Sequence, residues 1–203
     1  MIDSLERAAQ RPVSRETFER ICLYVEMLRA ESLRQNLIAA GTLDDLWSRH
    51  ILDSAQLMRF EPFAGASWVD IGSGAGLPGI VVACLTEGPL TLAEPRRLRA
   101  EFLQQVAKEL ALNVTVEALK AERLAGHYDV ITGRAVASLP QFLAMCGHLS
   151  TKNTVWVLPK GRSAQSELAE ARKAWQGVFH LEPSVTGADS QIVVATGVRA
   201  GKR

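Results

Sequence analysis

Cysteine is scarce in this sequence, and its three cysteines are far apart. Cys22, Cys84 and Cys146 form no C-x-x-C pattern, which argues against a disulfide framework and against a cysteine-based metal site. Cys84 and Cys146 lie in apolar stretches, and neither has the setting of a thiolate nucleophile. The four histidines also lack the spacing of metal ligands. We therefore expect no metal site, and a protein that works in a reducing compartment.

Long apolar runs and a strong charge of one sign are also missing. The longest apolar run, 80–85, is too short to span a membrane, and the charged N-terminal segment lacks the apolar centre of a signal peptide. With 23 Lys and Arg against 22 Asp and Glu, the net charge is only +1 at pH 7. Any contact with nucleic acid must therefore come from local basic patches. We expect a cytoplasmic, monomeric protein that does not bind membranes.

The most informative stretch is a glycine-rich segment that follows a short apolar run. Asp70 closes the run, Gly72, Gly74 and Gly76 follow at every second position, and Pro78 stands where a helix can begin. Glycines allow positive φ and let backbone N–H groups approach a ligand. A helix N-terminus behind the turn adds a partial positive charge. This order predicts a strand, turn and helix that bind a nucleotide-like ligand.

Two cofactors fit this segment. The glycines at 72–76 have the D-x-G-x-G-x-G spacing typical of S-adenosylmethionine (AdoMet) sites, whereas the glycines from 74 to 79 satisfy the G-x-G-x-x-G dinucleotide fingerprint. Glu94 closes the next apolar run and could bind ribose hydroxyls in either case. Asp70 favours AdoMet, because it would repel a pyrophosphate and attract the ammonium of the methionine part. The basic cluster that keeps an NADP site open is Arg96, Arg97 and Arg99.

Helical patterns fill the first sixty or so residues, and strand-length apolar runs follow. Ser14 is the expected N-cap of the first long helix, and a second helix is expected from about Thr42. The predicted strands are 68–71, 90–93, 114–116, 130–132, 155–158 and 192–196, with a late antiparallel strand at 178–185. The predicted helices between them are 77–85, 97–110, 139–149 and 164–175. This alternation predicts a mostly parallel α/β sheet in residues 63–203, with 1–62 as a helical extension packed into the same globular unit.

Ligands bind at the carboxyl ends of parallel strands, which directs attention to the residues that follow each strand. Ala121 and Glu122 follow the third strand, where the Glu122 carboxylate could reach an adenine amino group. Arg134 follows the fourth strand. Its guanidinium could pair with a ligand carboxylate, face an anionic substrate, or form a structural ion pair with Asp129 or Glu122.

The segment after the fifth strand carries Lys160 and Arg162, which could meet a phosphate backbone. The usual device for methylating nucleobase amino groups, an Asn or Asp followed by Pro-Pro and an aromatic residue, is absent after the fourth strand. Together with the lack of a nucleophile and a metal, this absence favours a chemistry that needs none of these groups.

Five segments of the chain are informative together: Asn36-Leu37-Ile38-Ala39, Arg49-His50-Ile51-Leu52-Asp53-Ser54, 70–79, Arg134-Ala135-Val136-Ala137-Ser138 and Lys160-Gly161. In this order and spacing they resemble the RsmG (GidB) family, the bacterial 16S rRNA guanine-N7 methyltransferases. The block Arg-His-x-x-Asp-Ser and the Leu-Pro-Gly end of the glycine segment are more specific than the glycines alone. The resemblance runs from about residue 36 to residue 161.

The resemblance implies a class I, Rossmann-like, AdoMet-dependent methyltransferase with a mostly parallel sheet and an N-terminal helical extension. It implies a guanine in the 530 loop of 16S rRNA as substrate, in the decoding region, either free or in the small ribosomal subunit. Guanine N7 has a lone pair and no proton, so its methylation needs no general base. The AdoMet contacts carried over by position are Gly72, Leu77, Ala121, Glu122 and Arg134.

Four residues are candidates for positioning the guanine: Asn36, His50, Asp53 and Arg134. Asn36 and Asp53 could instead cap helices, and His50 could be a buried histidine with satisfied hydrogen bonds. Two other functions stay open at this point. One is an NADP-linked oxidoreductase, and the other is an RNA chaperone that binds AdoMet without transferring its methyl group.

Overall fold

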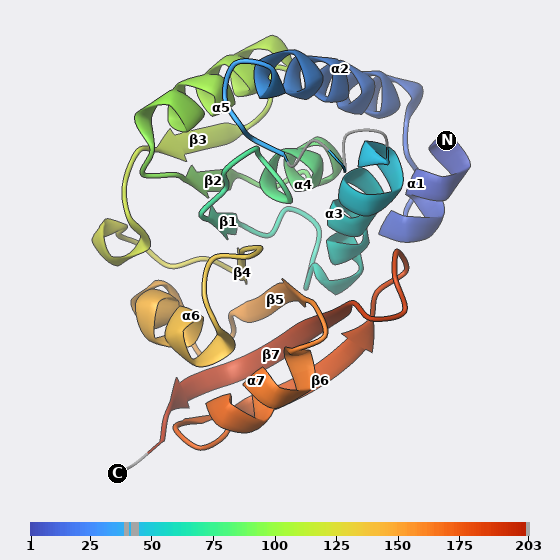
Figure 1. Cartoon of the computed structure of the whole chain (residues 1–203). Coiled ribbons are helices and arrows are strands. Elements are labelled where there is room, and N and C mark those ends of the chain that lie inside the picture. Colours follow the sequence, from blue (N-terminus) through green and yellow to red (C-terminus); the bar gives the residue numbers. More distant parts are fainter. Residues whose placement is uncertain (39–40, 42–44, 202–203) are drawn as a thin grey trace.

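The computed structural model describes residues 1–38, 41 and 45–201, which include one seven-stranded sheet (Figure 1). The strands are β1 (Trp68–Ile71), β2 (Leu90–Ala93), β3 (Val114–Glu117), β4 (Val130–Thr132), β5 (Val155–Lys160), β6 (Trp175–Pro183) and β7 (Gln191–Ala200). Their order in the sheet is β3-β2-β1-β4-β5-β7-β6. The first five strands pair in parallel, whereas β7 is antiparallel to both β5 and β6. The predicted mostly parallel α/β sheet is confirmed.

Helices cover both faces of the sheet, because alternate residues of each strand point to opposite sides. Trp68 of β1 belongs to one hydrophobic cluster and Val69 to the other. The first cluster contains residues of α1 (Ile2–Ala9), α2 (Arg15–Ser32), α4 (Gly79–Leu85) and α5 (Arg97–Glu109). The second contains residues of α6 (Leu139–Cys146) and α7 (Ala164–Ala171).

The N-terminal helices pack into the same core as the sheet. Leu5 of α1 and Tyr24 of α2 are fully buried in one cluster with Trp68 of β1 and Val81 of α4. The expected N-cap of α2 is present, since the Ser14 hydroxyl accepts a 3.0 Å hydrogen bond from a backbone N–H in the first turn. In the described part of the chain, no helix is long and apolar enough to cross a membrane.

The second predicted helix is irregular. Its expected start at Thr42 lies outside the described residues. The part that the structure describes begins with one π-helical segment, η2 (Trp47–Leu52), and continues through α3 (Asp53–Ala55) and the 3-10 segment η3 (Gln56–Phe60). His50 lies in η2 and Asp53 is the first residue of α3, so both side chains come from an irregular helix.

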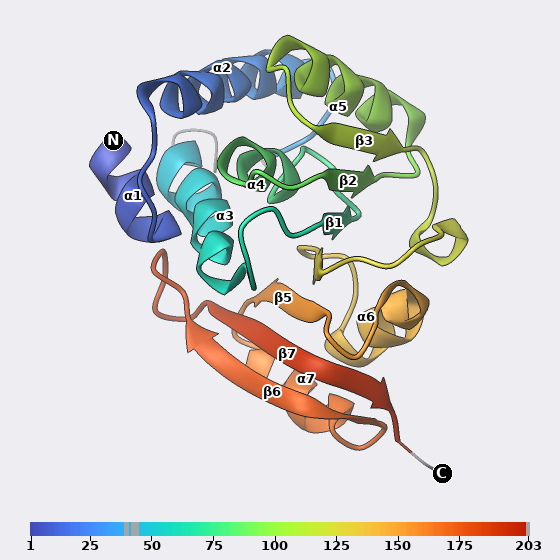
Figure 2. The same ribbon diagram turned by 180° about the vertical axis from the view of Figure 1, so that it is seen from behind.

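Several other boundaries differ from the predicted ones. Strand β6, expected at 178–185, spans Trp175–Pro183, and β7, expected at 192–196, spans Gln191–Ala200. The helix α4 begins at Gly79, so Pro78 is its N-cap and not its first residue. Helix α7 ends at Ala171 and β6 begins at Trp175, because Trp175 pairs with Ala200 of β7. Figure 2 shows β6 and β7 as a long hairpin beyond β5. Helix α6 ends at residue 146 and is followed by the 3-10 turn η5 (Gly147–Leu149).

Tyr24 ties α2 to the glycine-rich turn, because its buried hydroxyl donates a 2.8 Å hydrogen bond to the carbonyl oxygen of Ala75. We predict that Tyr24→Phe lowers the free energy of unfolding by about 1–3 kcal/mol, since that carbonyl loses a buried partner. Tyr128→Phe is the matched control, because Tyr128 is half-buried and its hydroxyl makes no hydrogen bond to any described residue. Urea unfolding measures both variants, and equal losses would contradict the role of Tyr24.

Candidate functional site

The glycine-rich turn after β1 requires its glycines. Gly72, Gly74 and Gly76 all have positive φ, at 67°, 57° and 94°. A Cβ on Gly72 would lie 2.8 Å from a methyl of Val136, and one on Gly76 would lie 2.7 Å from Ile80. Only Gly74 has an open side, where the nearest atom to a Cβ would be 3.7 Å away. The turn is therefore packed on two sides and accessible on one.

Asp70 supports the turn from beneath. Its side chain is fully buried, and one carboxylate oxygen accepts a 3.1 Å hydrogen bond from the backbone N–H of Gly79 at the start of α4. The other oxygen has no hydrogen-bond partner among the described residues. Burial raises the pKa of Asp70 to about 7. This carboxylate contacts the start of α4 and does not line the hollow described below, so its expected contact with a ligand ammonium stays a prediction.

Glu94 joins the turn to the end of β2. It is buried, with 3% of its surface exposed. One carboxylate oxygen accepts a 2.9 Å hydrogen bond from the backbone N–H of Gly74, and the other accepts one of 2.9 Å from the N–H of Arg96. A carboxylate has about four acceptor sites, so both oxygens can still accept from ligand hydroxyls. Glu94 lies at the glycine turn, as predicted, but it does not line the hollow described below, so its contact with a ribose stays a prediction.

A hollow of about 530 Å³ opens above the glycine turn. Its volume falls within the range of about 300–1,000 Å³ that small-molecule sites occupy. One wall is apolar and includes Leu37 and Ile38, and the other carries the cations of Arg99 and Arg134. The sequence alone suggests Arg99 only as part of a possible NADP site. The turn itself contributes Gly72, Ser73, Gly74, Ala75 and Leu77.

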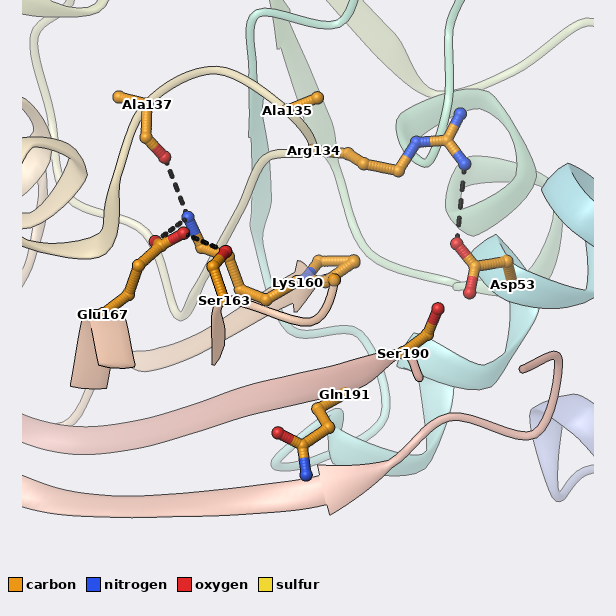
Figure 3. Close-up of a pocket in the computed structure, with 11 residues that line it drawn as sticks. Asp53, Arg134, Ala135, Ala137, Lys160, Ser163, Glu167, Ser190 and Gln191 are labelled. Carbon is orange, nitrogen blue, oxygen red and sulfur yellow. Dashed lines mark hydrogen bonds and ion pairs between the residues drawn. The ribbon is translucent and has the colours of Figure 1, made fainter. Parts of the chain in front are cut away.

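At one edge of this hollow lies a polar cluster, which we call the His50 cluster: His50, Asp53 and Arg134. The Arg134 guanidinium lies 3.1 Å from Nδ1 of His50 and 3.5 Å from a carboxylate oxygen of Asp53. Figure 3 shows the contact between Arg134 and Asp53. Burial, followed by the charge of Arg134, lowers the pKa of His50 to about 4. Arginine can only donate, so Nδ1 accepts and the neutral ring carries its proton on Nε2.

Residues from the C-terminal hairpin complete the surroundings of Asp53, and sequence reasoning missed them. The second oxygen of Asp53 accepts hydrogen bonds from the Gln56 amide at 2.8 Å and from the Thr186 hydroxyl at 2.9 Å. Gln56 is itself fully buried and bonds the backbone N–H of Val185. Thr186 is 133 positions from Asp53, so no local pattern could have linked the two.

Two further hollows adjoin the His50 cluster. One, of about 310 Å³, extends from Asp53 and Arg134 to Lys160 and Glu167 and is shown in Figure 3. The other, of about 510 Å³, lies between His50 and the loop from 186 to 190. The cluster therefore stands where three hollows meet, at the carboxyl ends of the central strands.

Lys160 does not have the exposed position that was expected of a phosphate contact. Its ammonium donates to the carbonyl oxygen of Ala137 at 2.8 Å and forms a 2.9 Å ion pair with Glu167. Only 11% of its side chain is exposed. Arg162, in contrast, is 84% exposed and pairs with the exposed Asp189. Of the two basic residues, Arg162 alone has the exposure that an RNA phosphate requires.

The remaining predicted residues lie at the margin of the site or away from it. Ala121 and Glu122 belong to the 3-10 turn η4 (Ala121–Arg123); Ala121 is buried, Glu122 is exposed, and neither lines the hollow above the glycine turn. Asn36 is exposed just before the apolar wall. Asp129 bonds Ser67, so Arg134 does not use it as the structural partner that we had considered. No group of three or more metal-binding side chains occurs among the described residues.

Solved structures with this fold are AdoMet-dependent methyltransferases and related proteins. The ribosomal protein L11 methylase of Lactobacillus delbrueckii subsp. bulgaricus has a TM-score of 0.58 at 10% identity, covering 76% of this chain and 79% of its own. Magnesium protoporphyrin IX methyltransferase of Synechocystis PCC 6803, solved with bound SAH, has a TM-score of 0.54 at 14% identity, covering 70% and 78%. At these identities the likeness shows the fold, which is that of class I methyltransferases.

Sequence relatives are much closer. Ribosomal RNA small subunit methyltransferase G of Zymomonas mobilis is 44% identical over 94% of this chain and 90% of its own length. The protein of the same name from Sphingopyxis alaskensis is 47% identical over 94% of this chain and 83% of its own. The family model for GidB, rRNA small subunit methyltransferase G, matches residues 17–192. The chain therefore belongs to the GidB family of AdoMet-dependent rRNA small subunit methyltransferases.

Proposed function

We propose that this enzyme transfers the methyl group of AdoMet to N7 of a guanine in the 530 loop of 16S rRNA. One observation carries the choice of atom: the side chain nearest to a general base, His50, has its Nδ1 occupied by Arg134 and its pKa lowered to about 4. A site without an available base suits a nucleophile that has no proton to lose. Membership of the GidB family argues against an NADP-linked oxidoreductase, the other function that the glycine spacing allowed.

The residues around the glycine turn fit the cofactor. Gly74 presents an open backbone, Leu77 and Ile38 give an apolar wall, and Glu94 retains acceptor sites for hydroxyl groups. When bound, AdoMet supplies a methyl group on a positively charged sulfur, ready for attack by a lone pair. We propose that Glu94 accepts hydrogen bonds from the ribose hydroxyls. Ala121 and Glu122 would contact the end of the ligand that is far from the glycine turn.

The His50 cluster would hold the guanine by orientation. The remaining N–H groups of Arg134 are donors, which suits an acceptor such as guanine O6. Correct alignment alone can lower a reaction barrier by roughly 7–11 kcal/mol. Because N7 lies on the Hoogsteen edge, the base must be unstacked or presented in an open loop. Asn36 and Arg162 are exposed on either side and would contact the RNA around it.

Methyl transfer to rRNA tests this function directly. Naked 16S rRNA and small ribosomal subunits, both from cells that lack the gene, are incubated with the enzyme and labelled AdoMet. We expect one methyl group per 16S rRNA, recovered as N7-methylguanine from a fragment that contains the 530 loop. Methylation at another atom or in another region would overturn the proposal. Tight AdoMet binding without transfer to either RNA would favour the chaperone function instead.

We predict that the rate of methyl transfer at saturating AdoMet shows no titration of His50 between about pH 6 and 9, because N7 releases no proton and the pKa of His50, about 4, lies below this range. His50→Gln, which keeps a hydrogen-bonding amide, should retain more activity than His50→Ala. Single-turnover rates on the parent and both variants provide the measurement. A rise near pH 6.5 in the parent, abolished equally by both substitutions, would instead identify His50 as a base.

We also predict that Glu94→Ala weakens AdoMet binding by about ten- to a hundred-fold. The reason is the loss of charge-assisted hydrogen bonds worth about 1.5–3 kcal/mol, both to the turn and to the ligand. Glu117→Ala is the matched control, because Glu117 ends the neighbouring strand β3 and its substitution removes the same charge. Calorimetry measures both affinities. An unchanged affinity in Glu94→Ala would remove Glu94 from the cofactor site.

A further inference from the structure

The loop between β4 and α6 brings Arg134 to the site, and its backbone is strained. Ala135 has a φ of 57°, in the left-handed region that a residue with a Cβ rarely adopts. Such a conformation persists only where the surrounding structure holds it. The same loop places Val136 against Gly72 of the cofactor turn. Its conformation therefore affects both the guanidinium of Arg134 and the wall of the cofactor hollow.

Lys160 and Glu167 hold this loop from its far side. The Lys160 ammonium bonds the carbonyl oxygen of Ala137, two residues after the strained Ala135, and pairs with Glu167 (Figure 3). The same Glu167 oxygen accepts a 2.7 Å hydrogen bond from the backbone N–H of Leu139, at the start of α6. The pair therefore binds the loop backbone on both sides of residue 138, at Ala137 and at Leu139.

The charges of this pair are well supported. Burial acts to raise the pKa of Glu167, but hydrogen bonds from Ser163, Lys160 and Leu139 outweigh it and hold the pKa below its ordinary value. The carboxylate is therefore ionised at neutral pH. Side-chain exposures of 11% for Lys160 and 20% for Glu167 limit screening by water.

We propose that Lys160 and Glu167 are positioning residues, which fix the loop from 134 to 138 so that Arg134 reaches His50 and Val136 closes on the cofactor turn. The inference rests on the proposed methyl transfer, and it replaces the expectation that Lys160 contacts RNA phosphates. Lys160 acts through the loop and touches neither substrate nor cofactor.

The two roles of Lys160 predict different measurements. A lost phosphate contact would lower the slope of log affinity against log salt by about 0.7 and leave kcat intact. A lost positioning contact leaves the salt slope unchanged and lowers kcat by up to about a hundred-fold, the effect expected of a misplacement of about 1 Å. We expect the second result for Lys160→Met, and most of the activity to return in Lys160→Arg, which keeps a cation for both acceptors.

Two readouts are independent of the RNA substrate. Hydrogen exchange of the loop amides should be faster in Lys160→Met even without AdoMet, and calorimetry should show AdoMet affinity reduced by about fivefold or more. These results would stand even if the methylated atom proved to be another one. Lys152→Met is the matched control, because Lys152 is exposed in the turn before β5 and its substitution removes the same charge.

Glu167→Gln provides a second variant in case Lys160→Met fails to fold. It keeps the size of the side chain and one acceptor oxygen but loses the charge, so we expect the same changes with a smaller amplitude. A reduced salt slope with unchanged loop exchange, AdoMet affinity and kcat in Lys160→Met would overturn the proposal and restore Lys160 as an RNA contact.

Discussion

The hydrogen bond from Arg134 to Nδ1 of His50 is the interaction on which the proposed chemistry of the site depends. A guanidinium keeps its protons at every physiological pH, so it permanently occupies the only ring nitrogen that could have accepted a proton. The imidazole becomes a fixed donor. The irregular helix that carries His50 and Asp53 and the loop after β4 must meet at one point for this bond to form. The rest of the fold can be understood as the means of bringing them together.

The sheet supplies this meeting point, because its central strands end side by side. β1 leads into the cofactor turn and its neighbour β4 leads into the loop with Arg134. On the next strand, β5, Lys160 stands at the carboxyl end and secures that loop. The proposed cofactor turn, the loop with Arg134 and the contact that holds this loop therefore follow three adjacent strands, in the order in which those strands pair.

Much of this arrangement is readable from the sequence, where local patterns determine it. The alternation of strands and helices predicted the sheet, and the glycines predicted the tight turn after β1 at which we propose that the cofactor binds. The sequence could not show the partners that act at long range. Lys160 reads as a free cation until Glu167 and Ala137 are seen beside it. The strained backbone of Ala135 cannot be predicted from its residue type, because alanine normally avoids a positive φ.

The bond between Asp53 and Thr186 has a consequence for the order in which the enzyme matures. These residues are separated by 133 positions, and contacts of such separation form late because closing the intervening chain is entropically costly. A ribosome completes the cofactor turn more than a hundred residues before it adds Thr186. The hydrogen bonds around Asp53 thus remain incomplete until the C-terminal hairpin has been made and has docked.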